Sequence, residues 1–273
     1  MKKPPGTLTV ILLILILFNG VNSILLSQVP EQDSIHPKII ELTQGCKLVV
    51  DPKIDLSDTI SIRIINGIRN LVPKIQKWIP ADSATIKLAI SSVNILPVWG
   101  IGARTLSGYN DHHREETVEI YYDPDHPNFK VEFIMRTLAH ELHHVCRVRM
   151  PDFQLSILEC MVNEGLADHF MVEILDCEQT PWSKALTEEQ IQQYMIRVKQ
   201  LMLEKYESWT KDLDIWMLYG KPGPDAIPRW TGYSIGWRIV ENYLKAHPDA
   251  RASSLVFTSP EEIVRSTPEL TGD

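Results

Sequence analysis

The run Ala139-His140-Glu141-Leu142-His143-His144 constrains this chain more than any other feature, because it places an HExxH motif inside an apolar segment long enough to form a helix. Each residue of a helix advances by about 100°, so His140 and His144 lie one turn apart on one face, with Glu141 beside them. Two imidazoles in this position can bind one metal ion. Glu141 is too close in sequence to be a natural third ligand, but it is well placed to accept a proton from a metal-bound water. The motif therefore predicts a metal site with Glu141 as general base.

A second helix supplies a candidate third ligand. Apolar residues recur at three- and four-residue steps from Asp152 to Leu175, which predicts a helix over this segment. Glu164 and Asp168 share one face of it. Because catalytic zinc takes three protein ligands and leaves a fourth position to water, we expect Glu164 to complete the site. Asp168 is expected to accept a hydrogen bond from the other ring nitrogen of a ligand histidine.

These residues resemble the signature of the gluzincins, the thermolysin-like zinc peptidases. In that family, nineteen residues separate the second histidine from a glutamate, and an Asn-Glu-x-x-x-Asp signature surrounds the glutamate; Asn163 occupies the first position here. The resemblance implies one zinc ion, with Asn163 and Asp168 supporting its ligands. A metzincin is excluded, because Arg147 and Met150 stand where that family requires a glycine and a third histidine.

The chain is still more similar to an uncharacterised family of predicted zinc-dependent proteases. The shared features are His-Glu-Leu-His-His-Val-x-Arg at 140–147, Glu-Gly-Leu-Ala-Asp at 164–168 and Gly-Tyr-x-x-Gly at 232–236. The resemblance covers roughly Ile86 to Leu270. It implies a chemistry, zinc-dependent hydrolysis, without naming a substrate.

A peptidase of this type needs a hydrogen-bond donor for the developing oxyanion. Tyr233 is the first candidate, since it opens a predicted helix between glycines that allow a close backbone approach. Packing of the C-terminal helices is the alternative role for Tyr233. His169 and Arg229 are weaker candidates for the donor.

Two further polar residues lie on the HExxH helix. His143 is about 60° from His140 and is expected to pack or to line the rim of the site, not to bind metal. Arg147 lies nearly on the face of His140. It is expected either to pair with a carboxylate near the metal or to remain solvated.

The N-terminus has the pattern of a secretory signal. Lys2 and Lys3 precede an apolar run from Leu8 to Phe18. The small residue Ser23 then suits cleavage by signal peptidase before Ile24. Eleven apolar residues are too few to cross a bilayer, which needs about twenty. We therefore predict a signal peptide over residues 1–23 and an exported protein, periplasmic or extracellular; an uncleaved signal-anchor is the alternative.

The charge of the chain limits its partners. Residues 1–23 contain two lysines and no other charged residue, so their removal changes the net charge from −8 to −10. An acidic protein has no electrostatic attraction to phosphate backbones or anionic lipid. We expect a peptide or protein substrate, no nucleic acid and no stable membrane anchor after cleavage. The oligomeric state is left open.

Four cysteines, an even number, remain in the predicted mature chain, and three disulfide pairings are possible. Cys160 lies one turn before Glu164, whereas Cys146 should point away from the metal, which argues against a bridge between the two metal helices. Burial as small apolar side chains is the alternative for all four, Cys46, Cys146, Cys160 and Cys177.

The predicted fold is α+β and zincin-like, in a single domain over residues 24–273, with an α/β part at about 24–150 and a helical part at about 151–273. A small antiparallel sheet and the active-site helix, capped by Asn128, are expected in the first part. Outside the metal site, the predicted helices are Asp58–Trp78 (kinked or split at Pro73), Thr187–Tyr206, Tyr233–Ala246 and a short one from Ser259. The predicted strands are Lys47–Val50, Thr85–Val93 and Thr117–Tyr122. Two segments are expected to be connections without regular structure: the glycine-bearing 100–109 and the irregular 209–231.

The gluzincin resemblance also implies an edge strand beside the metal helix, to which an extended substrate adds. Thr117–Tyr122 is the candidate, because Val118, Ile120 and Tyr122 alternate with Glu119 and Tyr121; an ordinary amphipathic strand is the alternative.

Together these features predict an exported zinc peptidase in which Glu141 activates water. One rival is a binding or chaperone-like module with structural zinc, which would have a closed fourth metal position. The other is a zinc hydrolase of a non-peptide amide or ester, which would lack a strand edge beside the metal.

Overall fold

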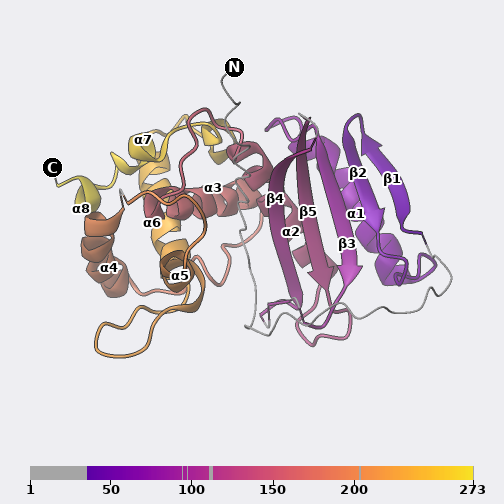
Figure 1. The fold of residues 1–273 in the computed structure, drawn as a ribbon, viewed down its shortest axis with the longest axis horizontal. Helices are drawn as coiled ribbons and strands as arrows, with labels where there is room; N and C mark the ends of the chain where they lie inside the picture. The colour runs from indigo at the N-terminus through magenta and orange to yellow at the C-terminus, as the bar shows by residue number, and fades with distance from the viewer. Residues whose placement is uncertain (1–35, 94, 97, 111–112, 203, 273) are drawn as a thin grey trace, which may run out of the picture.

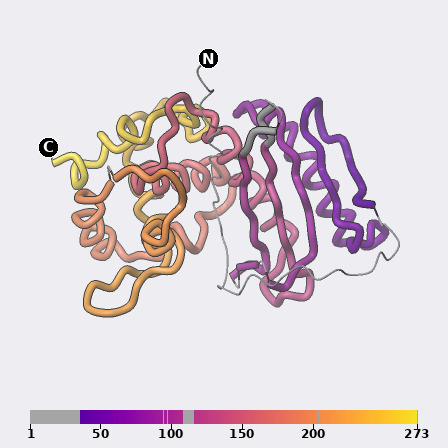
Figure 2. The backbone as a smooth tube through the Cα atoms, viewed as in Figure 1, coloured from indigo at the N-terminus to yellow at the C-terminus, as the bar shows by residue number. Residues whose placement is uncertain are grey.

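The computed structural model describes residues 36–93, 95–96, 98–110, 113–202 and 204–272. The chain is α+β, as expected: a five-stranded sheet and its helices form one half, and a mainly helical part forms the other (Figure 1). The backbone passes from the sheet half, indigo to magenta, into the helical half, pink to yellow (Figure 2). The predicted signal peptide over residues 1–23 lies outside the described residues. Within the described part, no helix has the length and apolar character needed to cross a membrane.

The sheet is mixed, so the expectation of an antiparallel sheet was wrong in strand direction. Its order is β1-β2-β3-β5-β4. β2 pairs in parallel with β3, and β3 pairs in parallel with β5, whereas the β1–β2 and β4–β5 pairs are antiparallel. Parallel neighbours need a crossover, and helix α1 provides it between β2 and β3. The strands are β1 Lys38–Thr43, β2 Cys46–Val50, β3 Ala84–Ile90, β4 Ile101–Asn110 and β5 His113–Tyr122.

The edge strand beside the metal helix is β4, not the Thr117–Tyr122 segment predicted from the sequence. That segment belongs to β5, which pairs with β3 on one side and with β4 on the other. The alternation of Val118 and Ile120 with polar residues correctly indicated which face of β5 is buried. Periodicity along one strand carries no information about which strands flank it. The glycine-bearing connection expected at residues 100–109 is therefore the edge strand itself.

Helices α1 and α2 cover one face of the sheet (Figure 1). α1, Thr59–Ile75, begins at Asp58, whose carboxylate accepts a hydrogen bond from the Ser61 amide at 2.9 Å, and it continues through Pro73 to end two residues later. α2, Val131–Arg147, begins after Lys130 with no side-chain cap, so the prediction that Asn128 caps it was wrong. Every residue of α2 from Leu138 to Arg147 is buried. The HExxH motif thus lies in the fully enclosed half of the helix.

Helix α3, Ile157–Leu175, packs between α2 and α6, Thr231–Ala246. The hydroxyl of Ser156 caps α3 by accepting from the Glu159 amide at 3.0 Å, so the helix starts later than predicted. α3 and α6 cross at two glycines. A Cβ atom on Gly236 would lie 1.9 Å from the Met161 carbonyl oxygen, and one on Gly165 would lie 2.3 Å from the Gly236 carbonyl oxygen. Only glycine permits this backbone contact, which packs α6 closely against α3.

The remaining elements complete the helical half. The predicted capping box at Thr187 and Gln190 is present and opens α4, which ends at Leu201 and not at Tyr206. Ser259 caps α7 as expected. The segment predicted to be irregular at 209–231 contains short helical turns. The helices of this half, besides α3 and α6, are α4 Glu188–Leu201, α5 Lys211–Asp214, the π-helical η1 Ile215–Tyr219, the 3-10 helix η2 Ala252–Leu255, α7 Pro260–Val264 and α8 Pro268–Thr271.

Candidate metal centre

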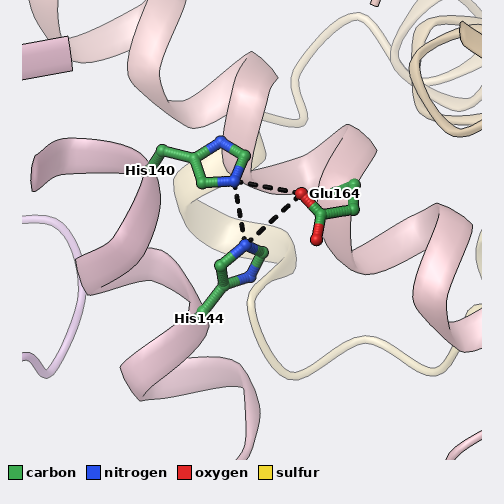
Figure 3. Close-up of side chains that lie close together, drawn as sticks. All are labelled: His140, His144 and Glu164. Carbon is green, nitrogen blue, oxygen red and sulfur yellow. Dashed lines mark hydrogen bonds and ion pairs between the residues drawn. The ribbon is translucent and has the colours of Figure 1, made fainter. Parts of the chain in front are cut away.

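His140 and His144 on α2 converge with Glu164 on α3 (Figure 3). The two Nε2 atoms are 2.9 Å apart, and Glu164 Oε2 lies 3.0 Å from His140 Nε2 and 3.5 Å from His144 Nε2. All three side chains are buried. In a tetrahedral zinc site with metal–ligand distances of about 2.0–2.1 Å, the ligand atoms are about 3.3 Å apart. The three atoms therefore have the spacing of one face of such a site.

The hydrogen bonds behind the histidines fix where their lone pairs point. His140 Nδ1 lies 2.8 Å from Asp168 Oδ1, and His144 Nδ1 lies 2.9 Å from Asn163 Oδ1. Because these oxygens only accept, each Nδ1 carries a hydrogen and each Nε2 presents its lone pair to the centre. Two nitrogen lone pairs and a carboxylate oxygen then face one another in a buried space. This arrangement is repulsive without a cation, so the donor set fits a zinc ion.

The electrostatics of the centre favour a positive charge. Burial by itself raises the pKa of Glu164, but the imidazoles of His144 and His140 outweigh it and hold that pKa at about 2. Burial by itself lowers the pKa of His140, but the carboxylates of Asp168 and Glu164 raise it well above its ordinary value. The carboxylates that would hold a proton on His140 also favour a bound cation in its place.

Asp168 is held by two hydroxyl groups that sequence reasoning missed. Its Oδ2 accepts a hydrogen bond from Thr180 Oγ1 at 2.6 Å and another from Ser183 Oγ. All three side chains are buried. Thr180 and Ser183 lie in an irregular segment after α3, where no periodicity marks them. Only the folded chain brings them to the carboxylate that lies 2.8 Å from His140 Nδ1.

Glu141 is fully buried, next in sequence to His140, one of the candidate metal ligands. Its Oε2 accepts a hydrogen bond from Thr105 Oγ1 on β4 at 2.6 Å, and its Oε1 has no hydrogen-bond partner in the described part of the chain. Burial raises the pKa of Glu141, although His144 and His140 partly offset this. Thr105 is a second contact that the sequence did not reveal, because β4 lies far from α2 in the chain.

Tyr233 lies at the start of α6, where it lines the same cavity as His140 and Glu141. It is 3% exposed. Burial raises the pKa of Tyr233 well above its ordinary value, and the nearby carboxylate of Glu164 adds to the rise. The phenol is therefore neutral at ordinary pH and keeps a proton to donate.

Each of the other candidates lies against an aromatic ring. The ring of His143 is buried against Phe170, with centroids 5.5 Å apart, and burial lowers the pKa of His143 well below its ordinary value. His169 stacks on Trp237 and places Nε2 3.2 Å from the Trp237 carbonyl oxygen. The Arg229 guanidinium lies 4.4 Å from the centroid of the Trp230 ring. The packing role expected for His143 agrees with its position.

All four cysteines are free thiols. Cys46, Cys146 and Cys160 are buried and Cys177 is half-buried, so the structure agrees with the alternative of small apolar side chains. Burial raises the pKa of Cys146 to about 12, so its thiol stays protonated.

Two pockets reach the candidate metal ligands. The larger one is bounded by His140, Glu141 and Tyr233 and otherwise has mainly apolar walls from β4, α2, α3 and the segment around Trp182. The smaller one is lined by Asn163 and Glu164. The apolar walls of the larger cavity are formed by Leu96, Trp99, Ile101, Met171 and Trp182.

Comparisons with known proteins agree with this geometry. The family model described as "Predicted Zn-dependent protease (DUF2268)" matches residues 107–265, which is more than half of the chain. The match includes His140, Glu141, His144, Glu164, Asp168 and Tyr233, but not Thr105. A curated relative, "Uncharacterized protein YjaZ" of Bacillus subtilis (strain 168), is 30% identical over 122 residues, which is 43% of this chain and 45% of the relative. The chain thus spans less than half of that relative's length. No solved structure matches.

Proposed function

Because the chain belongs to this family of predicted Zn-dependent proteases, we propose that it is a single-zinc peptidase whose ligands are His140, His144 and Glu164. The observation that carries the proposal is the convergence of three buried lone-pair donors beside a carboxylate that is not one of them. In the described residues the cluster contains three protein ligands, which favours a catalytic site with an open position over a closed structural one. A zinc ion bound there supplies a Lewis acid that acidifies water and polarises a carbonyl group.

Glu141 acts as the general base in this proposal. Its carboxylate accepts a proton from the attacking water and delivers it to the leaving amine. The position of Glu141 beside the ligands, with Oε1 lacking a protein partner in the described residues, supports this role. Burial also supports it, because a raised pKa makes a carboxylate a better proton acceptor.

Tyr233 donates a hydrogen bond to the oxyanion that develops on the substrate. Its neutral phenol and its place on the wall of the cavity with His140 and Glu141 support this role. The close crossing of α3 and α6 at Gly165 and Gly236 fixes the residue there.

The substrate is an extended peptide that adds to β4. β4 forms one edge of the sheet, packs against α2, and contributes Ile101, Gly102 and Ala103 to the larger cavity. A peptide that pairs with an edge strand presents alternate side chains to the pockets beside it. The apolar walls favour an apolar side chain next to the cleaved bond.

The protein is exported and works as one domain over residues 24–273 after removal of residues 1–23. Export is supported by Lys2, Lys3 and the apolar run that follows them. A single domain is supported by the ligand set, because α2 packs on the sheet while α3 packs on α6. No nucleic-acid partner is proposed for a chain with a net charge of −8.

The experiment compares the purified mature protein with Glu141→Gln on a proteome-derived peptide library, with zinc content measured in both. Wild type should cleave peptides, with a preference for apolar residues at the cleavage site. Glu141→Gln should keep zinc and fold but lose about 10²- to 10⁴-fold in turnover. Cleavage of small amides or esters with no cleavage of any peptide, or a zinc-loaded Glu141→Gln protein as active as wild type, would contradict the proposal.

A further inference from the structure

Thr105 makes the shortest polar contact to the proposed base. Its Oγ1 lies 2.6 Å from Glu141 Oε2 and 3.2 Å from the Glu141 carbonyl oxygen. A threonine hydroxyl has one hydrogen to donate, and an ionised carboxylate is a stronger acceptor than a carbonyl. Both residues are buried, at 1% and 0% exposure, so water does not compete for this hydrogen. The hydrogen bond therefore goes to Oε2.

This contact makes the two oxygens of Glu141 inequivalent. Oε2 is held by Thr105, whereas Oε1 is buried without a protein partner in the described residues. We propose that Thr105 is a positioning residue, which holds Oε2 so that Oε1 is the oxygen that exchanges protons with the attacking water and the leaving amine. The inference rests on the proposed role of Glu141 as base.

The strand that carries Thr105 makes it suited to this role. A glutamate side chain has three rotatable bonds, and in α2 only its Cα position is fixed by the helix. Thr105 lies in the middle of β4 and is paired with Val118 of β5, so its Cα is fixed by the sheet. The hydrogen bond joins these two rigid elements through the reacting carboxylate. A hydroxyl on the proposed substrate-binding strand thereby sets the direction of the base relative to the peptide.

Removal of the hydroxyl should reduce turnover more than substrate binding. Thr105→Val keeps the shape of the side chain without the donor, and Thr105→Ser keeps the donor without the methyl group. We expect Thr105→Val to keep one zinc per chain, to keep KM within about threefold of wild type and to lose about 10- to 100-fold in kcat, because misplacement of a catalytic group by about 1 Å has effects of this size. Thr105→Ser should recover most of the loss. Thr117→Val on the neighbouring strand is the matched control and should behave as wild type.

A double mutant tests whether Thr105 acts through Glu141. In the Glu141→Gln background, Thr105→Val should cause no further loss of kcat, because the group that it positions is no longer a base. A readout that does not involve activity is a crystal structure of the metal-free protein. There the Glu141 carboxylate should leave its present rotamer in Thr105→Val and keep it in Thr105→Ser. Should Thr105→Val fail to fold, Thr105→Ala makes the same comparison with a smaller side chain.

The outcomes separate this inference from the proposed function. If Glu141→Gln is inactive but Thr105→Val and Thr105→Ala turn over like wild type, Thr105 has no positioning role and the proposed function stands. An equal loss in Thr105→Ser and Thr105→Val would also overturn the inference, because the hydroxyl would then be irrelevant. If Glu141→Gln is fully active, the proposed function itself fails.

Discussion

Arg147 and Glu159 form an ion pair in which neither side chain reaches solvent. Arg147 Nε lies 2.8 Å from Glu159 Oε1, and Nη2 lies 2.8 Å from Oε2. Nη1 donates to the carbonyl oxygens of Val256 at 3.1 Å and Thr258 at 2.7 Å. One arginine on the metal helix thus joins α2, α3 and the segment after η2. The sequence left open whether Arg147 is paired or solvated. It is paired with Glu159, which is not one of the candidate metal ligands.

Loss of one partner of this pair should destabilise the protein strongly. Glu159→Leu leaves the guanidinium buried without its countercharge, which typically costs about 3–5 kcal/mol in the free energy of unfolding. The double variant Arg147→Met/Glu159→Leu removes both charges and should be more stable than Glu159→Leu. Urea denaturation gives the free energy of unfolding of the wild type, the single variant and the double variant. A decrease below about 1 kcal/mol in Glu159→Leu would show that the pair does not carry this stability.

The metal assignment predicts about one zinc per chain, lost on substitution of a ligand. His144→Ala and Glu164→Ala should each abolish zinc retention, as measured by elemental analysis after gel filtration. His143→Leu is the matched control on the same helix turn, because neither ring nitrogen of His143 has a partner in the described residues. This variant should keep its zinc. Wild-type protein that cannot take up zinc would contradict the assignment.

The Asp168 network predicts a graded effect on zinc affinity. Loss of a carboxylate that orients a ligand histidine typically costs about 10- to 100-fold, so Asp168→Ala should weaken zinc binding without abolishing it. Thr180→Val removes one of the hydroxyls that hold Asp168 and should have a smaller effect of the same sign. Competition with a chromophoric chelator measures the zinc affinity of both variants. Unchanged affinity in Asp168→Ala would rule out the orienting role.

Tyr233→Phe separates an oxyanion donor from a packing residue. The phenyl ring fills the same space, so fold and zinc content should be preserved. Turnover should fall by about 10²- to 10³-fold with little change in KM, because only the developing charge interacts with the lost hydroxyl. Steady-state kinetics on one peptide substrate is sufficient. Wild-type kcat in this variant would leave Tyr233 with packing alone.

His169 predicts a pH dependence of stability. Burial against Trp237 lowers the pKa of His169 to about 4, whereas the unfolded chain has the ordinary value of about 6.5. As the pH falls, the imidazole of residue 169 is therefore protonated in the unfolded state before it is protonated in the folded state. The folded state keeps its full stability, as far as this residue is concerned, above about pH 6.5 and loses stability as the pH falls towards 4. His169→Phe keeps the stacking and should reduce the loss of stability between pH 7.5 and pH 5. The measurement is urea denaturation of metal-free protein, with His36→Gln, at an exposed position, as control. Equal pH slopes in wild type and His169→Phe would contradict the prediction.

The sequence by itself determined the features that depend on residues close together in the chain. His140 and His144 share a face because one helical turn separates them, and the caps at Thr187 and Ser259 act within three residues. The pairing of Glu164 with the histidines was predictable because two adjacent helices carry a known spacing. Local geometry of this kind is nearly independent of the rest of the fold.

Only the tertiary structure decided which distant segments meet. Thr105 reaches Glu141 across 36 positions because β4 pairs with β5 and lies at the sheet edge beside α2. The direction of the strand pairs, the contact of Gly236 with the Met161 backbone, and the partner of Arg147 have the same origin. Periodicity shows which face of an element is buried but does not identify the element that covers it. The candidate metal ligands, Asp168 and the proposed base could therefore be identified in the sequence, whereas the hydroxyl groups that hold the carboxylates of Asp168 and Glu141 became visible only in the folded chain.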